Sequence, residues 1–297
     1  MCDIIPKKLE TSEEKHNFIN SFDNFLFDCD GVIWHASTVL EGVREVLYTL
    51  KKMGKRIIYV TNNSSKSRAT YLKKFQKLDL PATLDDIFSS AVAAAYYVKH
   101  FVNIKEDEKI YVVGGEGICR ELEEQGVHWC GSDDDNKPIS EEEFTEIQPD
   151  PKVRAVMFGF DVNINYRKFA RAFTYLNSNP DCLFLATNTD MTYPTKHLEF
   201  PGTGSMIHTL IAGTKRTPTV LGKPTTNMMD CIIQKFNLDR SRTCMVGDRL
   251  ITDIAFGKNS NLSTLLVLTG VTTVEAMNES KDIKPNYYIS SLGDLHA

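Results

Sequence analysis

At 297 residues, the chain is longer than a typical single domain and short enough for two closely associated domains. Hydrophobic residues make up 42% of it and charged residues 25%, which is typical of a soluble globular protein and excludes a disordered or fibrous one. The formal net charge is -5, and no dense cluster of lysine and arginine is present. Nucleic acid is therefore not expected as a partner, because binding to a phosphate backbone depends on cationic side chains.

Cellular location is suggested by three absences in the sequence. No apolar run approaches the roughly 18 residues that span a bilayer, and the first fifteen residues lack the apolar region of a secretory signal. The seven cysteines are scattered without a CxxC pair, which favours reduced thiols over a disulfide framework or a zinc site. We therefore expect a cytoplasmic protein without a membrane partner.

Strands and helices alternate near the N-terminus. Short apolar runs at 25–27 and 57–60 each stop at polar residues, as buried strands do where they meet a loop. Apolar residues at helical spacing predict a helix over 43–50, ended by Gly54, and a second helix is expected from about residue 67. This alternation of strands and helices predicts an α/β fold, in which crossover helices join the strands of a parallel sheet.

Strands and helices are also expected to alternate near the C-terminus, with strands at 219–221, 243–246 and 265–268 and a helix over 228–236. The middle of the chain has expected strands of its own, at 110–113 and 153–158, and an acidic loop at 133–135 that we expect to be solvated and mobile. We interpret this middle part as an inserted domain. The predicted organisation is 1–99 and 215–297 for the two parts of the core and 100–214 for the insertion.

Polar side chains follow directly after four of the predicted strands. They are Asp28 with Asp30, Thr61, Lys223 and Asp248. Ligands of a parallel α/β sheet gather beyond the carboxyl ends of its strands, where successive loops meet. We therefore expect these five side chains to share one site.

The residue types in this set indicate phosphate chemistry. Asp28 and Asp30 point the same way if strand geometry continues, and two such carboxylates need a cation to stay ionised. With Asp248 as a third oxygen ligand, the set favours Mg²⁺, while Lys223 and the Thr61 hydroxyl, with nearby backbone N–H groups, are suited to phosphate. We assign nucleophilic attack to Asp28, because the strand fixes it, and acid–base catalysis to Asp30.

Four segments resemble, in order, the four motifs of the haloacid dehalogenase superfamily. They are 28–32, 60–64, 222–224 and 247–253. Further segments resemble the branch that contains 4-nitrophenylphosphatases, phosphoglycolate phosphatases and pyridoxal phosphatases. They are 28–34, 186–190, 201–205 and 268–272. The resemblance covers nearly the whole chain.

The resemblance implies a Rossmann-like core with a large α/β cap, and Mg²⁺ as cofactor. Asp28 would be both nucleophile and metal ligand, Asp30 the acid–base with its carbonyl on the metal, and Asp248 a further ligand. Asp253 would orient Lys223 or a water on the metal. The second motif would bind phosphate through Thr61, Asn62 and Asn63, together with Lys223 of the third motif.

The resemblance also implies that Phe160, Asp190 and Tyr193 of the cap select the leaving group. Pyridoxal phosphatases carry an arginine after the second motif, where this chain has Ser65-Lys66, and a histidine where it has Tyr193. Phe160 also lacks their phenolic hydroxyl. A small phosphorylated metabolite of the phosphoglycolate type is therefore favoured over pyridoxal phosphate, and a homodimer formed through the cap would fit the family.

Two other functions are weighed against a phosphatase. A catalytically retired module that only binds phosphate would not need Asp30, which is intact in this chain. A dehalogenase is disfavoured by the second and fourth motifs, which are of the magnesium type. The sequence therefore predicts a magnesium-dependent phosphatase.

Overall fold

The computed structural model describes residues 5–195 and 197–296 of the chain. Contacts divide the chain into two compact units, which are described separately. The first contains Met1–Thr61, Ala69–Phe88 and Lys223–Ala297, and the second contains Asn62–Arg68 and Ser89–Gly222. The predicted insertion, 100–214, lies wholly inside the second unit.

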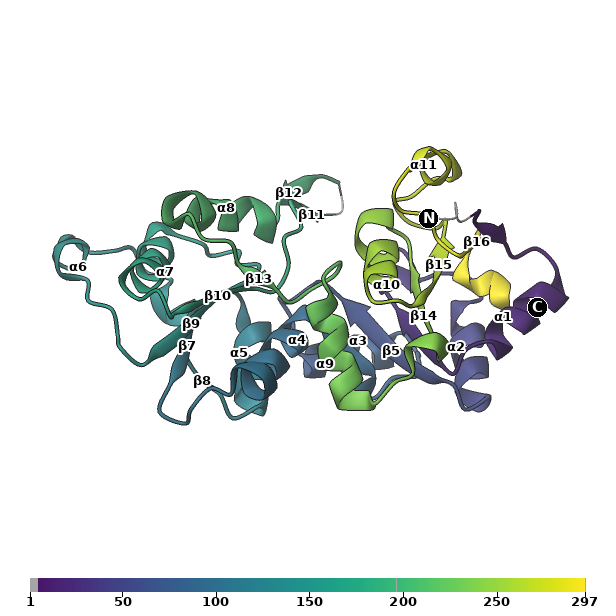
Figure 1. The fold of residues 1–297 in the computed structure, drawn as a ribbon, viewed down its shortest axis with the longest axis horizontal. Helices are drawn as coiled ribbons and strands as arrows, with labels where there is room; N and C mark the ends of the chain where they lie inside the picture. The colour runs from purple at the N-terminus through teal and green to yellow at the C-terminus, as the bar shows by residue number, and fades with distance from the viewer. Residues whose placement is uncertain (1–4, 196, 297) are drawn as a thin grey trace. The chain divides into compact units, whose positions relative to one another are not determined.

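A seven-stranded sheet forms the centre of the first unit (Figure 1). Its strand order is β1-β16-β15-β14-β2-β5-β6, and β2 pairs in parallel with both β14 and β5. The strands are β1 (Lys7–Lys8), β2 (Asn24–Phe27), β5 (Arg56–Thr61), β6 (Ile87–Ser89), β14 (Thr243–Gly247), β15 (Ser263–Val267) and β16 (Tyr287–Ile289). A hairpin of β3 (Trp34–His35) and β4 (Thr38–Val39) follows β2.

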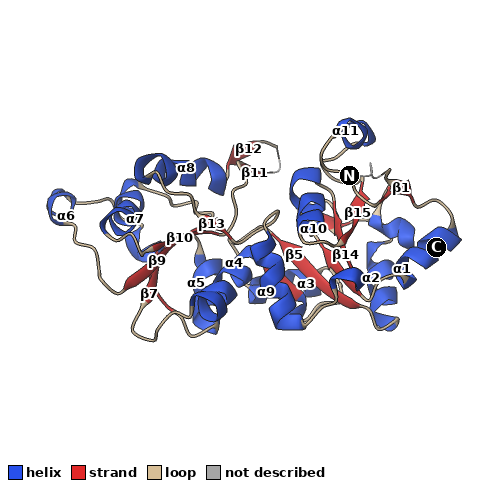
Figure 2. Ribbon diagram, viewed as in Figure 1, coloured by secondary structure: helices blue, strands red, loops and turns tan. Residues whose placement is uncertain are grey.

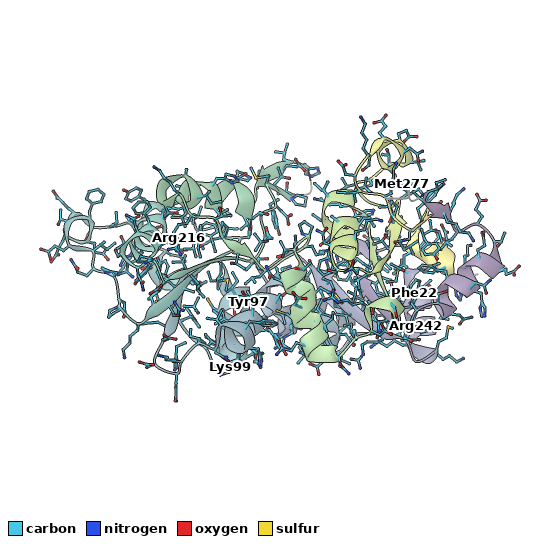
Figure 3. All side chains as sticks on the ribbon, viewed as in Figure 1. Phe22, Tyr97, Lys99, Arg216, Arg242 and Met277 are labelled. Atoms are coloured by element: carbon cyan, nitrogen blue, oxygen red, sulfur yellow. The ribbon has the colours of Figure 1, made fainter. Side chains whose placement is uncertain are left out.

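Helices alternate with these strands, as Figure 2 shows by colour. They are α1 (Ser12–Asn20), α2 (Val43–Lys52), α3 (Arg68–Lys77), α9 (Thr226–Phe236), α10 (Ala255–Asn259) and α11 (Val274–Glu279). All four residues of β2 are buried, which is expected of a parallel strand covered on both faces. Met277 of α11 (Figure 3) packs with Ile254 and Leu266, so the helix is held by apolar contacts.

The second unit has its own five-stranded sheet, in the order β13-β10-β9-β7-β8. Its strands are β7 (Lys109–Val113), β8 (His128–Gly131), β9 (Val153–Phe158), β10 (Leu183–Ala186) and β13 (Thr219–Val220), and a separate hairpin is formed by β11 (Thr192–Pro194) and β12 (Glu199–Pro201). Its helices are α4 (Ser90–Tyr97), α5 (Glu116–Glu124), α6 (Glu141–Glu146), α7 (Tyr166–Ser178) and α8 (Thr203–Thr214). Arg216 (Figure 3) donates to the carbonyl of Leu176 at 2.7 Å and so ties the chain after α8 to α7.

The predicted α/β fold with a parallel sheet is confirmed, and most predicted strands and helices are present within a few residues. One assignment was wrong. Residues 219–221 were expected to form a strand of the core, but β13 pairs with β10 in the other sheet. Parallel strands of either sheet are short apolar runs, so the local pattern does not reveal which neighbour a strand takes.

The acidic loop at 133–135 also differs from its expected state. Asp135 is 1% exposed and accepts hydrogen bonds from Tyr111 Oη at 2.7 Å and from Arg167 Nε at 3.0 Å. A buried carboxylate needs such partners, and both lie far from it in sequence. Asp135 is therefore a structural residue of the second unit and not part of a solvated loop.

The described residues include no helix that is both long enough and apolar enough to cross a membrane.

Candidate active site

Two neighbouring strands of the core sheet end at aspartates. β2 ends at Phe27 and is followed by Asp28, whose N–H donates to Val246 of β14 at 2.9 Å. β14 ends at Gly247 and is followed by Asp248. Because β2 and β14 are adjacent and parallel, their ends bring the two carboxylates to the same edge of the sheet.

Three carboxylates meet at this edge. Oxygen atoms of Asp28, Asp248 and Asp253 all lie within 4.8 Å of one another. Asp253 belongs to a π-helical segment, Leu250–Ile254, that leads into α10. A methyl group on Gly247 would lie 2.1 Å from the Asp253 Cβ, so only glycine lets this segment approach the strand so closely. The resemblance implied that Asp253 orients Lys223 or a water on the metal, and Asp253 Oδ1 accepts a hydrogen bond from Lys223 Nζ at 2.7 Å.

Lys223 lies between two of these carboxylates. Its Nζ donates to Asp28 Oδ1 at 2.5 Å, to Asp253 Oδ1 at 2.7 Å and to the Val60 carbonyl at 3.1 Å. The residue is only 3% exposed. Burial alone would lower the pKa of Lys223, but Asp253 and Asp28 raise it above its ordinary value. Lys223 is therefore a fixed positive charge that lies against Asp28.

One lysine does not neutralise three carboxylates. Burial raises the pKa of Asp28 well above its usual range; Lys223 opposes this rise, while Asp253 and Asp248 add to it. Burial, together with Asp253, likewise raises the pKa of Asp248 to about 6. Further positive charge at this place would favour the ionised form of both groups.

The donor set fits a hard divalent cation. Asp248 Oδ2 accepts from the Val271 N–H at 2.8 Å, whereas Oδ1 of the same carboxylate is buried and has no hydrogen-bond partner among the described residues. A buried carboxylate oxygen without a donor is costly. Oxygen ligands in a cluster with excess negative charge are what Mg²⁺ requires.

The carboxylate of Asp30 is not part of this cluster. The chain turns directly after Asp28, with the Ile33 N–H donating to the Cys29 carbonyl at 2.9 Å, so strand geometry does not continue as the sequence analysis supposed. Asp30 is exposed and accepts a hydrogen bond from Trp34 Nε1 at 2.9 Å. Its predicted contribution to the metal, a backbone carbonyl, does not depend on the position of the side chain.

The hydrogen bond from Trp34 to Asp30 was not predicted from the sequence. The indole is fully buried, and its ring meets Phe75 edge to face with centroids 5.0 Å apart. Packing therefore fixes the N–H that holds Asp30. The only sequence signal was that Trp34 follows the first motif within the segment that carries the resemblance.

The second motif is divided between the two units. Thr61 ends β5 in the first unit and is buried, whereas Asn62 and Asn63 belong to the second unit. Asn62 Nδ2 donates to Asp190 Oδ2 at 3.1 Å, and Asn63 Oδ1 accepts from the Ser65 N–H at 2.9 Å. These two side chains therefore take part in contacts that order the loop after β5.

The three predicted specificity residues all lie in the second unit, where two of them touch each other. The rings of Phe160 and Tyr193 are stacked, with centroids 4.2 Å apart and an interplanar angle of 13°. Asp190 does not join this stack in any contact described, but accepts the hydrogen bond from Asn62. The aromatic pair offers a flat apolar surface, and Asp190 links the same region to the second motif.

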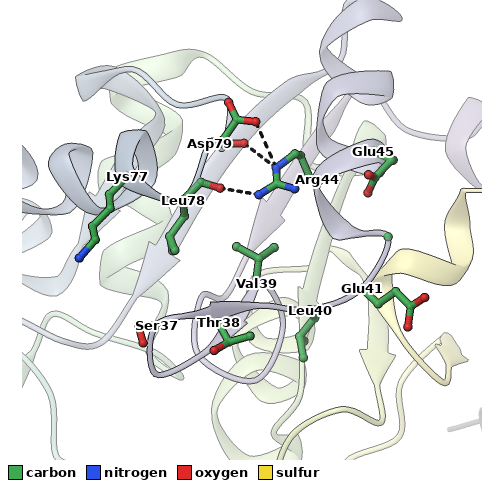
Figure 4. A pocket seen from close by; sticks show the side chains of 11 residues that line it. Ser37, Thr38, Val39, Leu40, Glu41, Arg44, Glu45, Lys77, Leu78 and Asp79 are labelled. Carbon is green, nitrogen blue, oxygen red and sulfur yellow. Dashed lines mark hydrogen bonds and ion pairs between the residues drawn. The ribbon is translucent and has the colours of Figure 1, made fainter.

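A groove of about 530 Å³ lies elsewhere on the first unit (Figure 4). It is lined by 37–42, 44–45 and 77–79. Arg44 donates to the carbonyls of Leu78 and Asp79, so its guanidinium binds the backbone just after α3. The lining contains none of the predicted site residues, and the groove plays no part in the chemistry below.

Comparison with known proteins shows the family of this chain. A model of haloacid dehalogenase-like hydrolases matches residues 25–128, and an HAD-hydrolase-like model matches residues 220–295. A 4-nitrophenylphosphatase of Schizosaccharomyces pombe is 45% identical over 97% of this chain and 98% of its own. The chain belongs to the haloacid dehalogenase-like hydrolases. Phosphoglycolate phosphatase 2 of Arabidopsis thaliana is 44% identical to this HAD hydrolase over 98% of the chain and 97% of its own.

Solved structures extend the similarity to the fold of the HAD phosphatases. A 4-nitrophenylphosphatase from Thermotoga maritima matches with a TM-score of 0.79 and 29% identity over 94% of this chain and 98% of its own. A glycerol phosphate phosphatase from Mycobacterium tuberculosis, in complex with magnesium, matches with a TM-score of 0.79 and 26% identity over 93% of this chain and 77% of its own. The predicted family and the predicted class, a phosphoric monoester hydrolase, are confirmed.

Proposed function

We propose that this HAD phosphatase hydrolyses small phosphomonoesters through a phosphorylated Asp28, with Mg²⁺ as its cofactor. The observation that carries the proposal is the cluster of Asp28, Asp248 and Asp253, with Lys223 Nζ 2.5 Å from Asp28. A nucleophile at a fixed strand end, next to a permanent cation, is what transfer of a phosphoryl group requires.

Asp28 and Asp248 would hold the magnesium ion, together with the carbonyl of Asp30. The unpartnered Asp248 Oδ1 and the excess of negative charge support this assignment. The glycerol phosphate phosphatase of similar structure is described in complex with magnesium, which supports the choice of this ion. When bound, the ion supplies positive charge to the oxygens of the transferring phosphoryl group.

We assign two chemical steps to Asp28 and Asp30. In the first, an Asp28 oxygen attacks phosphorus, the bond from phosphorus to the leaving oxygen breaks, and the protonated carboxyl of Asp30 gives its proton to that oxygen. In the second, Asp30 takes a proton from water, which attacks the phosphorus of the aspartyl phosphate. The phosphorus–Asp28 bond breaks, and inorganic phosphate and the Asp28 carboxylate are released.

Four residues would bind the phosphate of the substrate. Lys223 supplies a buried positive charge, and Thr61 supplies a hydroxyl at the end of β5. Asn62 and Asn63 would act through their backbone N–H groups, because their side chains already bond to Asp190 and Ser65. Such contacts stabilise negative charge on the phosphoryl oxygens during transfer.

We propose a small organic phosphate, of the kind that phosphoglycolate and glycerol phosphate represent, as the substrate. The names of the relatives support this class. Phe160, Asp190 and Tyr193 are proposed to select the leaving group, with the stacked rings contacting its carbon atoms. A homodimer formed through the cap remains a prediction from the resemblance.

A panel of phosphate esters tests the substrate class. With Mg²⁺ present, we expect release of phosphate from 4-nitrophenyl phosphate, phosphoglycolate and glycerol phosphate. The kcat/KM for the preferred small ester should exceed that for pyridoxal 5′-phosphate by about tenfold or more, because Phe160 and Tyr193 provide no cationic or imidazole group. Preference for pyridoxal 5′-phosphate would instead favour a pyridoxal phosphatase. Failure to hydrolyse any ester would favour a catalytically retired module that only binds phosphate.

The dependence of stability on pH gives a test of the metal site. The raised pKa of Asp248, about 6 against an ordinary value of about 3.9, means that folding favours the protonated form when no metal is present. That contribution is complete below about pH 4 and is lost as pH rises through about 6. Mg²⁺ requires the ionised form, so it should add most stability at the pH where the contribution of protonated Asp248 has been lost.

We therefore expect Mg²⁺ to raise the Tm by several degrees more at about pH 7.5 than at about pH 5. Differential scanning fluorimetry with and without the metal measures both values. The Asp248→Asn protein serves as the control, since its side chain cannot ionise and its Tm response to Mg²⁺ should be small at either pH. Equal responses of the unmodified protein at both pH values would count against Asp248 as a ligand.

A further inference from the structure

The turn after β15, residues 268–272, holds Asp248 through two backbone N–H groups. The Val271 N–H donates to Asp248 Oδ2 at 2.8 Å, and the Thr272 N–H donates to the Asp248 carbonyl at 3.1 Å. Asp248 is only 2% exposed. Its side chain is thus held through Oδ2, while Oδ1 is buried without a hydrogen-bond partner among the described residues.

The fit between this turn and Asp248 leaves no space for a side chain. A methyl group on Gly270 would lie 1.9 Å from Asp248 Oδ2 and 2.4 Å from its Cγ. These distances are far below any van der Waals contact, and Asp248 is the group that would have to move. Gly270 is therefore required by the position of the carboxylate and not by the conformation of the turn.

The same turn is joined to the loop that carries Asp28 and Asp30. The Thr269 hydroxyl donates to the Gly31 carbonyl at 2.6 Å. Gly31 has a φ of +85°, and a methyl group there would lie 2.9 Å from Asp248 Oδ2 and 3.2 Å from the Gly270 Cα. The first-motif loop, Asp248 and the turn therefore meet in contact, and a shift of one displaces the others.

We infer that Thr269, Gly270 and Val271 form a positioning clamp that sets the affinity of the site for Mg²⁺, an inference that rests on the proposed function. None of the three supplies a side chain to the cluster. They act on Asp248 through its Oδ2 and on the first-motif loop through Gly31. Groups that orient a metal ligand in this way commonly change metal affinity by 10- to 100-fold when they are altered, an order-of-magnitude range.

Two substitutions test the clamp. Thr269→Val keeps the shape of the side chain but removes its hydrogen bond to Gly31, and we expect the Kd for Mg²⁺ to rise by about tenfold. Gly270→Ala pushes on Asp248 directly, and the rise should approach ~100-fold. The Kd is measured by isothermal titration calorimetry and by the increase of Tm with Mg²⁺ concentration, so neither readout depends on turnover.

A matched control lies a few residues along the chain. The Thr273 side chain accepts from the Ala276 N–H at 3.2 Å and caps α11, without a described contact to Asp248. Thr273→Ala should lower the Tm, as loss of a cap does, but leave the Kd for Mg²⁺ within about twofold of that of the unmodified protein. A kcat at saturating Mg²⁺ within about threefold for Thr269→Val would separate loss of metal affinity from loss of chemistry.

The outcomes that overturn the inference differ from those that overturn the proposed function. If the unmodified protein binds Mg²⁺ and both Thr269→Val and Gly270→Ala bind it equally well, the clamp has no role in metal affinity. If the unmodified protein itself shows no response to Mg²⁺, both the clamp and the proposed cofactor are wrong. Should Gly270→Ala fail to fold, Thr269→Val alone decides the question.

Discussion

The Asp28→Asn protein is expected to lose at least about 10⁴-fold in kcat toward 4-nitrophenyl phosphate while keeping its fold. An amide cannot form the bond to phosphorus that the proposed mechanism requires, and no neighbouring carboxylate can replace it. Asp253 is bonded to Lys223 and to the Arg249 N–H at 3.1 Å, and Asp248 is held by Val271. Release of 4-nitrophenol measures the rate, and circular dichroism with thermal melting checks the fold.

The same variant tests the covalent intermediate directly. Acid quenching during turnover of ³²P-labelled substrate should trap label on the unmodified protein and none on Asp28→Asn. Asp282→Asn is a suitable control, because it makes the same chemical change at an exposed position. Label retained on Asp28→Asn, or activity near that of the control, would show that the nucleophile lies elsewhere.

Replacement of Lys223 by methionine should affect both activity and stability. The substitution removes the positive charge 2.5 Å from Asp28 and 2.7 Å from Asp253, and it leaves the buried Asp253 and the partly buried Asp28 without this ion pair. Breaking a buried ion pair in this way costs about 3–5 kcal/mol of the free energy of unfolding. Loss of a fixed charge at the phosphoryl group should lower kcat/KM by about 10²- to 10³-fold.

Added Mg²⁺ distinguishes these two effects. The metal returns positive charge to the cluster, so it should recover part of the lost stability of Lys223→Met but little of the lost activity. Lys235→Met is the control, since Lys235 lies on α9 and forms its ion pair with Asp85, whose side chain is 78% exposed. Surface pairs contribute about 0–1 kcal/mol, so this control should melt and turn over nearly as the unmodified protein does. Similar melting of both variants would mean that the buried pairs contribute little to stability.

Much of the fold was predictable because strand ends have a strong local signal. A buried parallel strand is a short apolar run, and the first polar residue after it marks the edge where ligands bind. Asp28, Thr61 and Asp248 follow from that signal alone. Asp28 does come directly after β2, Thr61 ends β5, and Asp248 comes directly after β14. Lys223 does lie next to Asp28, as predicted. The strand before it, β13, was expected in the core sheet but belongs to the other sheet.

The remaining features depend on contacts between distant parts of the chain. Nothing near Asp135 in the sequence indicates that Arg167 and Tyr111 surround it. The clamp on Asp248 likewise comes from the turn that follows the next strand, β15, and its contact with Oδ2 is made by the backbone N–H of Val271, which the type of side chain does not reveal. Such relations follow from tertiary packing, which periodicity and propensity do not encode.

The segment Asn62–Arg68 belongs to the second unit although the chain then returns to the first for 69–88. Within the second unit, Arg68 donates to the buried carboxylate of Glu121 through its N–H and its Nε, both at 2.7 Å. Exchange of the second unit between this chain and a relative would therefore need two separate stretches of sequence to be transplanted. A graft limited to 89–222 would bring Glu121 without Arg68, and its success would depend on whether the recipient supplies an arginine at that place.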